Sequence, residues 1–420
     1  MILFNRVLVI TAILLATSAS AFAGGIYLSE IGTPLSVGTA GVAGVTNTIG
    51  ADSVVTNPAG MASIDGDQAT AGIQLLLPTN RFDSDIATAG GSDGGNAGSP
   101  VAIPSLFAVR HLNEDWSVGL GVSAPLGGGV DYGRDFVGRY QAQLSELAVL
   151  SISPAVAYRV NDKLSLGAGV SALYTDMNLY IALKQPGPQA SDGQIRMDGL
   201  DDWGYQGYLG ATYQATDKLT IGAVYRTEAD VELEGDINFR NVTFPPFNLL
   251  TSQVNEAAVD FTYPQMVNLG FDYRLAENLK LLADFGWEEW SAFGDTRIGL
   301  SGDGSALTSF DRDWDDTWRV GIALGHKCSE RRIVTAGVSY DSSPVSDSKR
   351  TADLPVDEQL RFSGAYGGKI FGDNTKFALG ATYVWMGEGK MDQTAQGERF
   401  KGEFSTNHLI FLSATINYIF

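Results

Sequence analysis

Several segments of the chain alternate apolar and polar residues with a period of two. The segment at 376–386, KFALGATYVWM, places its larger apolar side chains on one face and small or polar residues on the other. The same alternation recurs at 164–174, 219–226, 318–325 and 334–340. Because neighbouring side chains of a strand point to opposite faces, this period predicts β-strands with one apolar face. Aromatic residues close the ends of several such faces, which is typical of strands that cross a bilayer between two interfaces; examples are Trp116, Trp203, Tyr213 and Tyr225.

The spacing of these segments predicts fourteen strands, which begin near residues 67, 101, 115, 147, 163, 203, 218, 264, 278, 316, 331, 358, 374 and 405. Six connections are short turns: HLNED, VNDK, ATDK, LAEN, CSER and GDNT. The other seven are long and cover roughly residues 79–100, 125–146, 177–202, 230–263, 291–315, 342–357 and 387–404. Short turns at one end and long connections at the other are the pattern of outer-membrane barrels. The predicted fold is therefore all-β, a 14-stranded antiparallel transmembrane β-barrel whose first and last strands pair, because hydrocarbon tolerates no free sheet edge.

The first residues predict export. Arg6 precedes an apolar run, Val7–Ala16, which leads into the small residues SASAFAGG. This is the pattern of a secretory signal peptide, so residues 1–23 are predicted to be removed after Ala23. The run is too short for a transmembrane helix, and no other stretch of about 18 apolar residues occurs in the sequence. The lone Cys328 cannot form a disulfide within the chain.

Residues 24–66 are rich in glycine and do not alternate clearly. They precede the barrel predicted at 67–420. A small eight-stranded barrel is filled by side chains, whereas a larger one leaves a lumen. We therefore expect residues 24–66 to form a periplasmic-side hatch, or plug, inside the barrel. Within it Asn57, Pro58 and Ala59 predict a turn that Pro58 fixes, with the Asn57 side chain free to bond nearby backbone groups.

The final segment, HLIFLSATINYIF, alternates like the others and ends on Phe420. A terminal phenylalanine on such a strand resembles the assembly signal of outer-membrane barrels. The barrel assembly machinery and outer-membrane lipid are therefore expected partners. The alternative is an ordinary last strand that happens to end in phenylalanine.

Composition argues against two other classes of protein. With 28 Lys and Arg against 48 Asp and Glu, the formal charge is −20, which repels the phosphate backbone of nucleic acids. His111, His326 and His408 are scattered, so no catalytic triad and no enzyme activity are predicted. The carboxylates are also scattered, and we predict no metal site and no cofactor. Without a nucleotide-binding loop, any transport would be passive.

Further motifs identify a resemblance along the whole chain. Besides the Asn-Pro-Ala sequence at 57–59, they are LSVGTAGVAG (35–44), ISPAVAYRVNDKLSLGAGV (152–170), IGAVYRTEADVELEG (221–235), WEEWSAFGD (287–295), DTWRVGIALG (316–325), VSYDSSPV (338–345) and INYIF (416–420). The chain resembles the FadL family of bacterial outer-membrane transporters for long-chain fatty acids and other hydrophobic compounds. The resemblance implies a 14-stranded barrel, capture of substrate by external loops, a conformational change in the hatch, and lateral release beside a kinked third strand.

Candidate capture residues lie in the long connection at 230–263. They are the apolar residues of FRNVTFPPFNLL, namely Phe239, Phe244, Phe247, Leu249 and Leu250. Exposed apolar residues usually mark a binding surface. The alternative is that they pack on their own loop. Leu126, Leu144 and Leu147 could form the opposite wall.

Arg226, Arg319 and Arg361 are candidates for binding a fatty-acid carboxylate, because each falls on the lumen-facing side of its strand and arginine binds carboxylates bidentately. The alternative is that they form structural ion pairs with the hatch or with other charged residues of the lumen; these are Lys280, Asp272, Asp284 and Glu288. The substrate could equally be a neutral or aromatic hydrocarbon.

Release is predicted at the third strand, where Gly119, Gly121 and Pro125 weaken strand pairing. Alternatively, these residues only make room for the hatch and end the strand. Two other functions stay open at this point, a general diffusion porin and a structural or adhesive barrel. The predicted hatch argues against the porin, and neither the hatch nor the apolar loop residues are explained by an adhesive barrel.

Overall fold

A computed structural model of the protein describes residues 28, 37–187, 191–244, 256–300 and 306–420. Strands dominate this part of the chain, and the short helices in it are far from the length and apolar character that a membrane-crossing helix needs. The predicted signal peptide lies outside the described residues, as does most of 24–36.

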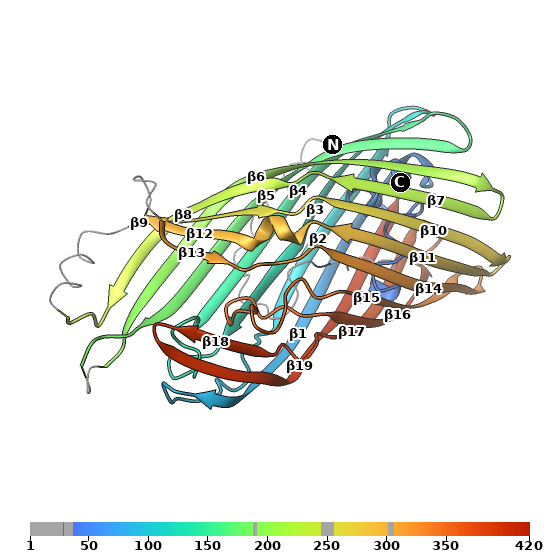
Figure 1. Ribbon diagram of the computed structural model, residues 1–420. Coiled ribbons are helices and arrows are strands. Elements are labelled where there is room, and N and C mark those ends of the chain that lie inside the picture. Colours follow the sequence, from blue (N-terminus) through green and yellow to red (C-terminus); the bar gives the residue numbers. More distant parts are fainter. Residues whose placement is uncertain (1–27, 29–36, 188–190, 245–255, 301–305) are drawn as a thin grey trace.

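Fourteen strands of the described chain form a closed ring, each paired antiparallel with the next (Figure 1). In ring order they are β1 (Gln68–Ala87), β2 (Val101–His111), β3 (Trp116–Asp131), β4 (Leu144–Arg159), β5 (Leu164–Leu183), β6 (Gly193–Thr216), β7 (Leu219–Arg226), β10 (Met266–Ala276), β11 (Leu279–Glu288), β14 (Thr317–Ser329), β15 (Arg332–Asp341), β16 (Gln359–Ile370), β17 (Thr375–Trp385) and β19 (Glu398–Ile419). The ring closes where β1 pairs with β19, from Gln68↔Ile419 to Ala87↔Phe400. The predicted 14-stranded antiparallel barrel is confirmed.

The long connections contain more strand than predicted. Five further strands lie there among the described residues: β8 (Ala229–Arg240), β9 (Glu256–Tyr263), β12 (Asp295–Leu300), β13 (Ala306–Asp311) and β18 (Met391–Ala395). The predicted starts near 203 and 405 are also too late, since β6 begins at Gly193 and β19 at Glu398. The ladders of the barrel therefore continue well beyond the predicted membrane-crossing segments.

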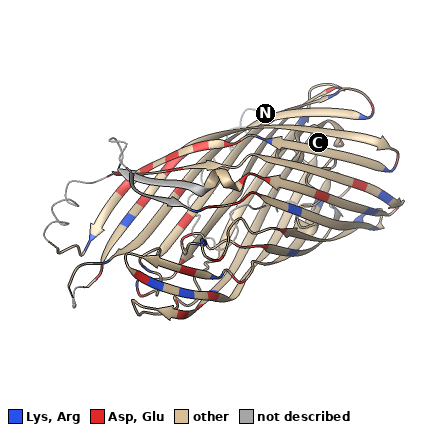
Figure 2. Cartoon of the chain, viewed as in Figure 1, with Lys and Arg blue, Asp and Glu red and all other residues tan. Residues whose placement is uncertain are grey.

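The parts of the strands beyond the membrane-crossing segments were not predicted. In these parts the apolar side chains face the interior of the barrel and the polar side chains face outward. On β8, Val231 and Leu233 are buried, while Glu232 and Glu234 are exposed. On the membrane-crossing segments the apolar residues point outward instead. Figure 2 shows acidic residues spread along the end of the barrel that carries the long connections, including β8. A charged outer wall with an apolar interior is the pattern of a strand in water, so this end lies outside the hydrocarbon layer.

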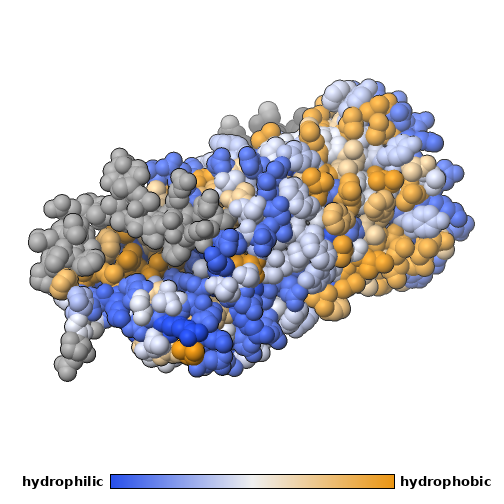
Figure 3. Space-filling model, viewed as in Figure 1, coloured by the Kyte–Doolittle hydropathy of each residue, from blue (hydrophilic) through white to orange (hydrophobic). Residues whose placement is uncertain are grey.

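The outward face nearer the short turns is apolar, as predicted. Exposed aliphatic side chains there include Leu120, Leu166, Leu209, Leu269, Ile322, Leu379 and Ile416. Figure 3 shows a hydrophobic band over this half of the molecule and a hydrophilic surface over the other. Aromatic pairs mark the two borders of the band, with ring centroids 4.7 Å apart for Trp116 and Tyr158, 5.2 Å for Tyr174 and Trp203, and 5.2 Å for Trp318 and Tyr340. This arrangement matches a barrel that spans a bilayer.

Residues 37–66, called here the N-terminal segment, pack against the inner face of the ring (Figure 1). The segment contains two short helices, α3 (Ser53–Thr56) and the 3₁₀ helix η1 (Pro58–Ser63). Side chains from the strands bond its backbone at several points. Thr382 Oγ1 donates to the Val37 carbonyl (3.0 Å), Tyr208 donates to the Val54 carbonyl (2.8 Å), and Arg159 donates to the Ala62 carbonyl.

Inward-facing glycines allow this close approach. A Cβ added to any of nine of them would lie within 3.0 Å of an atom of the N-terminal segment: Gly119, Gly121, Gly167, Gly210, Gly222, Gly270, Gly321, Gly337 and Gly380. They come from eight strands around the ring. The small residues on the polar face of the alternating pattern therefore have a packing role, because they leave the space that the segment occupies.

Gly222→Ala is expected to displace the N-terminal segment, because the new methyl group would lie 2.1 Å from the carbonyl oxygen of Val45. Overpacking of this kind costs roughly 1–3 kcal/mol. The measurement is the rate at which a protease cleaves residues 37–66 in the folded barrel, which should rise. Gly325→Ala is the matched control, since its methyl group would meet nothing closer than Thr335 Cγ2 at 3.9 Å. Equal cleavage rates in the two variants would contradict this packing.

Candidate functional site

The buried side chain of Asn57 connects the N-terminal segment to the barrel wall. Its Nδ2 donates to the carbonyls of Val45 (2.7 Å) and Ala211 (3.1 Å), and its Oδ1 accepts from the backbone N–H of Ala59 (3.1 Å). The bond to Ala59 is the local contact that the sequence predicted. The bond to Ala211 ties the turn to β6, and no sequence pattern indicated it. Pro58 begins η1 and, with Ala59, lies against Gly167 of β5.

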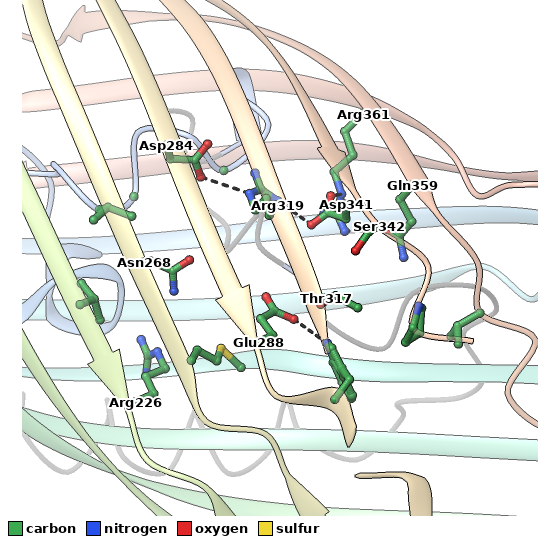
Figure 4. Close-up of a pocket in the computed structure, with 18 of the residues that line it drawn as sticks. Arg226, Asn268, Asp284, Glu288, Thr317, Arg319, Asp341, Ser342, Gln359 and Arg361 are labelled. Atoms are coloured by element: carbon green, nitrogen blue, oxygen red, sulfur yellow. Dashed lines mark hydrogen bonds and ion pairs between the residues drawn. The ribbon is translucent and has the colours of Figure 1, made fainter. Parts of the chain in front are cut away.

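A cavity of about 130 Å³ lies between the N-terminal segment and the long connections. All three predicted arginines line it, together with Asn268, Asp284, Glu288, Thr317, Asp341, Ser342 and Gln359 (Figure 4). Its remaining lining is largely apolar and includes Val45, Val55, Val224, Met266, Trp290, Trp314, Pro344 and Val356. The cavity thus offers both charged groups and apolar surface to one ligand.

Two of the arginines belong to a buried chain of ion pairs. Arg319 Nε lies 3.1 Å from Asp284 Oδ2, and Arg319 Nη1 lies 3.4 Å from Asp341 Oδ1. Asp341 Oδ2 in turn lies 3.3 Å from Arg361 Nε. Arg319 also donates to the Ala40 carbonyl of the N-terminal segment. These contacts favour the structural ion-pair alternative for Arg319 and Arg361, because buried charges need such partners.

Arg226 has different surroundings. Its guanidinium lies 4.7 Å from the centre of the Tyr208 ring and donates to the Val55 carbonyl. Among the described residues, no carboxylate lies within ion-pair distance of it. Of the three candidates, Arg226 is therefore the one whose charge is not balanced by a carboxylate among the described residues.

The apolar part of the cavity continues into a large buried cluster. Phe293 and Trp314 stack with ring centroids 4.9 Å apart, and Trp290 meets both rings edge to face at 5.5 and 5.6 Å. Leu126 and Leu147 belong to the same cluster, and Leu144 is half-buried nearby on β4. Phe239 packs on the cluster from β8, which fits the packing alternative given for the capture residues. Phe244 is half-buried, and Phe247, Leu249 and Leu250 lie outside the described residues.

Two buried arginines fasten the long connections to one another. Arg312 lies 2.6 Å from Asp353, and both side chains are almost completely buried. Arg350 lies 2.8 Å from Asp357 and donates to the carbonyls of Val356 (2.7 Å) and Lys390 (2.6 Å). The connection at 342–357 is thereby fixed over the cavity. Burial alone raises the pKa of the Asp353 carboxyl, but the charge of Arg312 and the hydrogen bonds outweigh it and hold this pKa below its usual range.

Strand pairing fails between β2 and β3, in a part of the barrel wall that does not line the cavity. The two strands pair only from His111↔Ser117 to Leu106↔Val122, although both continue further. Pro125 lies in the irregularity of β3 between Ser123 and Leu126. Its carbonyl accepts a bond from the Leu28 N–H (2.8 Å), and the buried Leu28 side chain packs in a cluster with Leu76, Val101 and Ile103. Gly119 and Gly121 lie below this point, within the paired part and against the N-terminal segment, which fits the alternative that they make room for it.

Several residues of the site were not predicted. Trp290 and Trp314 lie just before and within the connection predicted at 291–315, from which no site residue was predicted, and the two tryptophans were the available signal. Pro104 in β2 was a second signal, because a proline seldom occurs within a central strand. The Arg312–Asp353 and Arg350–Asp357 pairs form between residues whose sequence context carries no pattern. Lys280 and Asp272, predicted to face the lumen, form a pair of their own at 2.6 Å.

The closed ring, its outward apolar band and its internal cavity define an outer-membrane β-barrel of the transport class. Residues 14–420 match the family described as "Outer membrane protein transport protein (OMPP1/FadL/TodX)", and the chain belongs to this family. The family consists of transport proteins, which confirms that the protein is not an enzyme and that its location is the bacterial outer membrane.

Individual relatives are distant but cover most of the chain. The long-chain fatty acid transport protein of Escherichia coli O6:H1 is 22% identical over 85% of this chain and 87% of its own. A crystal structure of a Pseudomonas aeruginosa FadL homologue has a TM-score of 0.87 at 21% identity and covers 94% of this chain and 99% of its own. The CymD monoaromatic hydrocarbon channel has a TM-score of 0.68 at 22% identity, with 94% and 98% covered. These structures support the fold.

The buried Arg312–Asp353 pair makes the connection at 342–357 sensitive to acid. Because the pKa of Asp353 is lower in the folded protein than in the unfolded chain, the pair stabilises the connection above about pH 4. This contribution is lost as the pH falls through the lowered pKa. The protection of the amides of residues 342–357 against hydrogen exchange, corrected for the pH dependence of the intrinsic exchange rate, should therefore fall on acidification.

Asp353→Asn should loosen the same connection already at neutral pH, by roughly 3–5 kcal/mol, because it removes the carboxylate that balances the buried charge of Arg312. Asp347→Asn is the control, since Asp347 pairs with Arg350 from an exposed position and should change the exchange by less than about 1 kcal/mol. Similar exchange in the two variants would show that the buried pair does not fix the connection.

Proposed function

We propose that the protein takes up long-chain fatty acids or related hydrophobic compounds passively across the outer membrane. Substrate enters from the long connections and occupies the cavity above the N-terminal segment. The segment, acting as a hatch, then moves, and the substrate leaves sideways between β2 and β3. The observation that carries this proposal is the loss of β2–β3 pairing beyond Val122, beside an interior that the N-terminal segment fills.

The contacts at the pairing break support lateral release. Unpaired backbone groups are costly in hydrocarbon, so a gap in the wall needs a compensating partner. Leu28 supplies it, with its N–H on the Pro125 carbonyl and its side chain among Leu76, Val101 and Ile103. A movement of Leu28 away from Pro125 would uncover an apolar passage to the membrane.

The two-sided cavity supports a substrate with a long apolar part. Trp290, Trp314 and Val356 would contact that part, and Arg226 would bind a carboxylate if the substrate carries one. One relative is named for long-chain fatty acids and a structural neighbour for monoaromatic hydrocarbons, so both classes are candidate substrates. The capture role of Phe239, Phe244, Phe247, Leu249 and Leu250 remains part of the proposal.

The last residue is proposed to be recognised by the barrel assembly machinery. Phe420 is largely exposed at the seam of the ring, its N–H donates to the Asp67 carbonyl (2.9 Å), and its ring contacts Tyr418. An exposed aromatic end beside the closing strands is accessible to a protein partner during assembly and to lipid afterwards.

Uptake by cells that carry the protein distinguishes the proposed transporter from a porin. A long-chain fatty acid, a neutral aromatic hydrocarbon and a small sugar are compared, with Asn57→Ala beside the parent. Asn57→Ala removes the bonds to Val45 and Ala211, worth roughly 1–3 kcal/mol, and should disturb the hatch. We expect the parent to take up a hydrophobic compound selectively and Asn57→Ala to reduce this uptake about tenfold without loss of folding.

Free passage of the sugar with no hydrophobic preference would instead make the protein a general diffusion porin. Uptake of none of the three compounds would favour the structural or adhesive barrel.

Blocking the pairing break should stop release. Ala124 packs against the Leu28 cluster, so Ala124→Trp places a large ring in the proposed passage. Hydrophobic uptake should fall at least about tenfold, equivalent to a barrier of roughly 1.4 kcal/mol. The control is Ala108→Trp on the exposed, paired part of β2. Normal uptake by a folded Ala124→Trp variant would rule out this exit.

A further inference from the structure

Arg226 lines the ligand cavity and also bonds the N-terminal segment. Its guanidinium donates to the carbonyl of Val55, and the neighbouring Tyr208 hydroxyl donates to the carbonyl of Val54 (2.8 Å). Both carbonyls belong to the short helix α3. The arginine therefore stands between the space where a ligand would bind and the part of the segment just before Asn57.

The bonded residues lie directly against the third strand. A Cβ on Gly119 would be 2.8 Å from Val54 Cγ2, and one on Gly121 would be 2.5 Å from Val55 Cγ1. Val122, one residue beyond Gly121, is the last residue of β3 that pairs with β2. Arg226 thus fixes the very residues that fill the barrel interior beside the proposed exit.

In the part of the chain that the structure describes, the guanidinium of Arg226 donates to one backbone carbonyl, which is a weak partner for it. A carboxylate can accept two parallel, charge-assisted bonds from arginine, and these are roughly twice as strong as bonds to a neutral acceptor. The other cations of the cavity are less available, because Arg319 lies between Asp284 and Asp341, and Arg361 pairs with Asp341. Glu288 accepts a bond from the Trp290 indole (2.6 Å) and is not within ion-pair distance of Arg226.

We propose that Arg226 is a ligand-sensing latch. A carboxylate that enters the cavity takes the guanidinium from the Val55 carbonyl, and residues 53–57 are released from β3. A ligand without a carboxylate does not compete for Arg226 and leaves the latch closed. This inference rests on the proposed function, and it makes Arg226 a positioning residue that couples the chemistry of the ligand to the movement of the segment.

Thiol labelling of a buried position tests the latch. In a Cys328→Ser background, Val54→Cys places one cysteine at a fully buried site of the segment. The folded protein in lipid nanodiscs is treated with a maleimide alone, with palmitate, or with hexadecanol, which has the same chain length but no carboxylate. Palmitate should raise the labelling rate about tenfold or more, because the segment loses its bond from the charged Arg226 to the Val55 carbonyl. Hexadecanol should leave the labelling rate unchanged.

Arg226→Gln in the same background should label rapidly without ligand and show no further response to palmitate. Arg226→Lys, which keeps the charge, should fall between this variant and the parent. Arg196→Gln is the matched control, because Arg196 also stacks on a tyrosine, Tyr180, but lies outside the cavity. It should label as slowly as the parent.

Two outcomes would overturn the latch: an equal response to palmitate and hexadecanol, or an unchanged labelling rate in a folded Arg226→Gln variant. Uptake assays on the same variants separate the latch from the proposed function. If the parent takes up palmitate but labelling does not respond to it, only the latch is refuted. If the parent takes up no hydrophobic compound, the proposed function itself fails.

Discussion

Every backbone N–H and C=O in the hydrocarbon layer needs a partner within the protein, because lipid offers none. The ring of fourteen strands meets this need through the long β1–β19 seam. The closed ring also determines the rest of the architecture. Its outer face has an apolar band, its interior must be filled, and its two ends are polar. The β2–β3 break is significant for the same reason. At this break the Pro125 carbonyl finds its donor in Leu28, from outside the sheet.

The interior satisfies a second requirement, that charges removed from water be balanced. Asp284, Arg319, Asp341 and Arg361 alternate in sign along one wall of the cavity. Removing one member would leave a buried charge without its partner, which is far more destabilising than losing an exposed ion pair. Arg226 is held instead by a ring face and a carbonyl, so its environment is polar without being neutralised. The described lining of the cavity thus contains a wall of paired charges and, in Arg226, a cation without a carboxylate partner among the described residues.

Alternation was enough to predict the ring, because a strand with lipid on one side and a filled lumen on the other keeps a strict period of two. The same signal fails on β8 and the first part of β6, where water replaces lipid and the apolar residues change sides. Inward orientation of Arg226, Arg319 and Arg361 also follows from the period. Their partners do not, since the ion pair of Arg312 and Asp353 and the bond from Asn57 to Ala211 join residues far apart in sequence. At least one residue of each pair lies in a connection or in the N-terminal segment, where no period in the sequence relates it to its partner, and the two meet only in the folded barrel.

The order in which the parts meet follows from the position of the N-terminal segment in the chain. It is made before β1, yet it touches inward glycines on eight strands, up to Gly380 of β17. Its contacts are therefore almost all with residues synthesised later, and the seam that encloses it needs β19, the last strand. Contacts of such large sequence separation form slowly. The full set of contacts of the segment exists only once β17 is in place, so its seating is completed late in biogenesis, close to the closing of the seam.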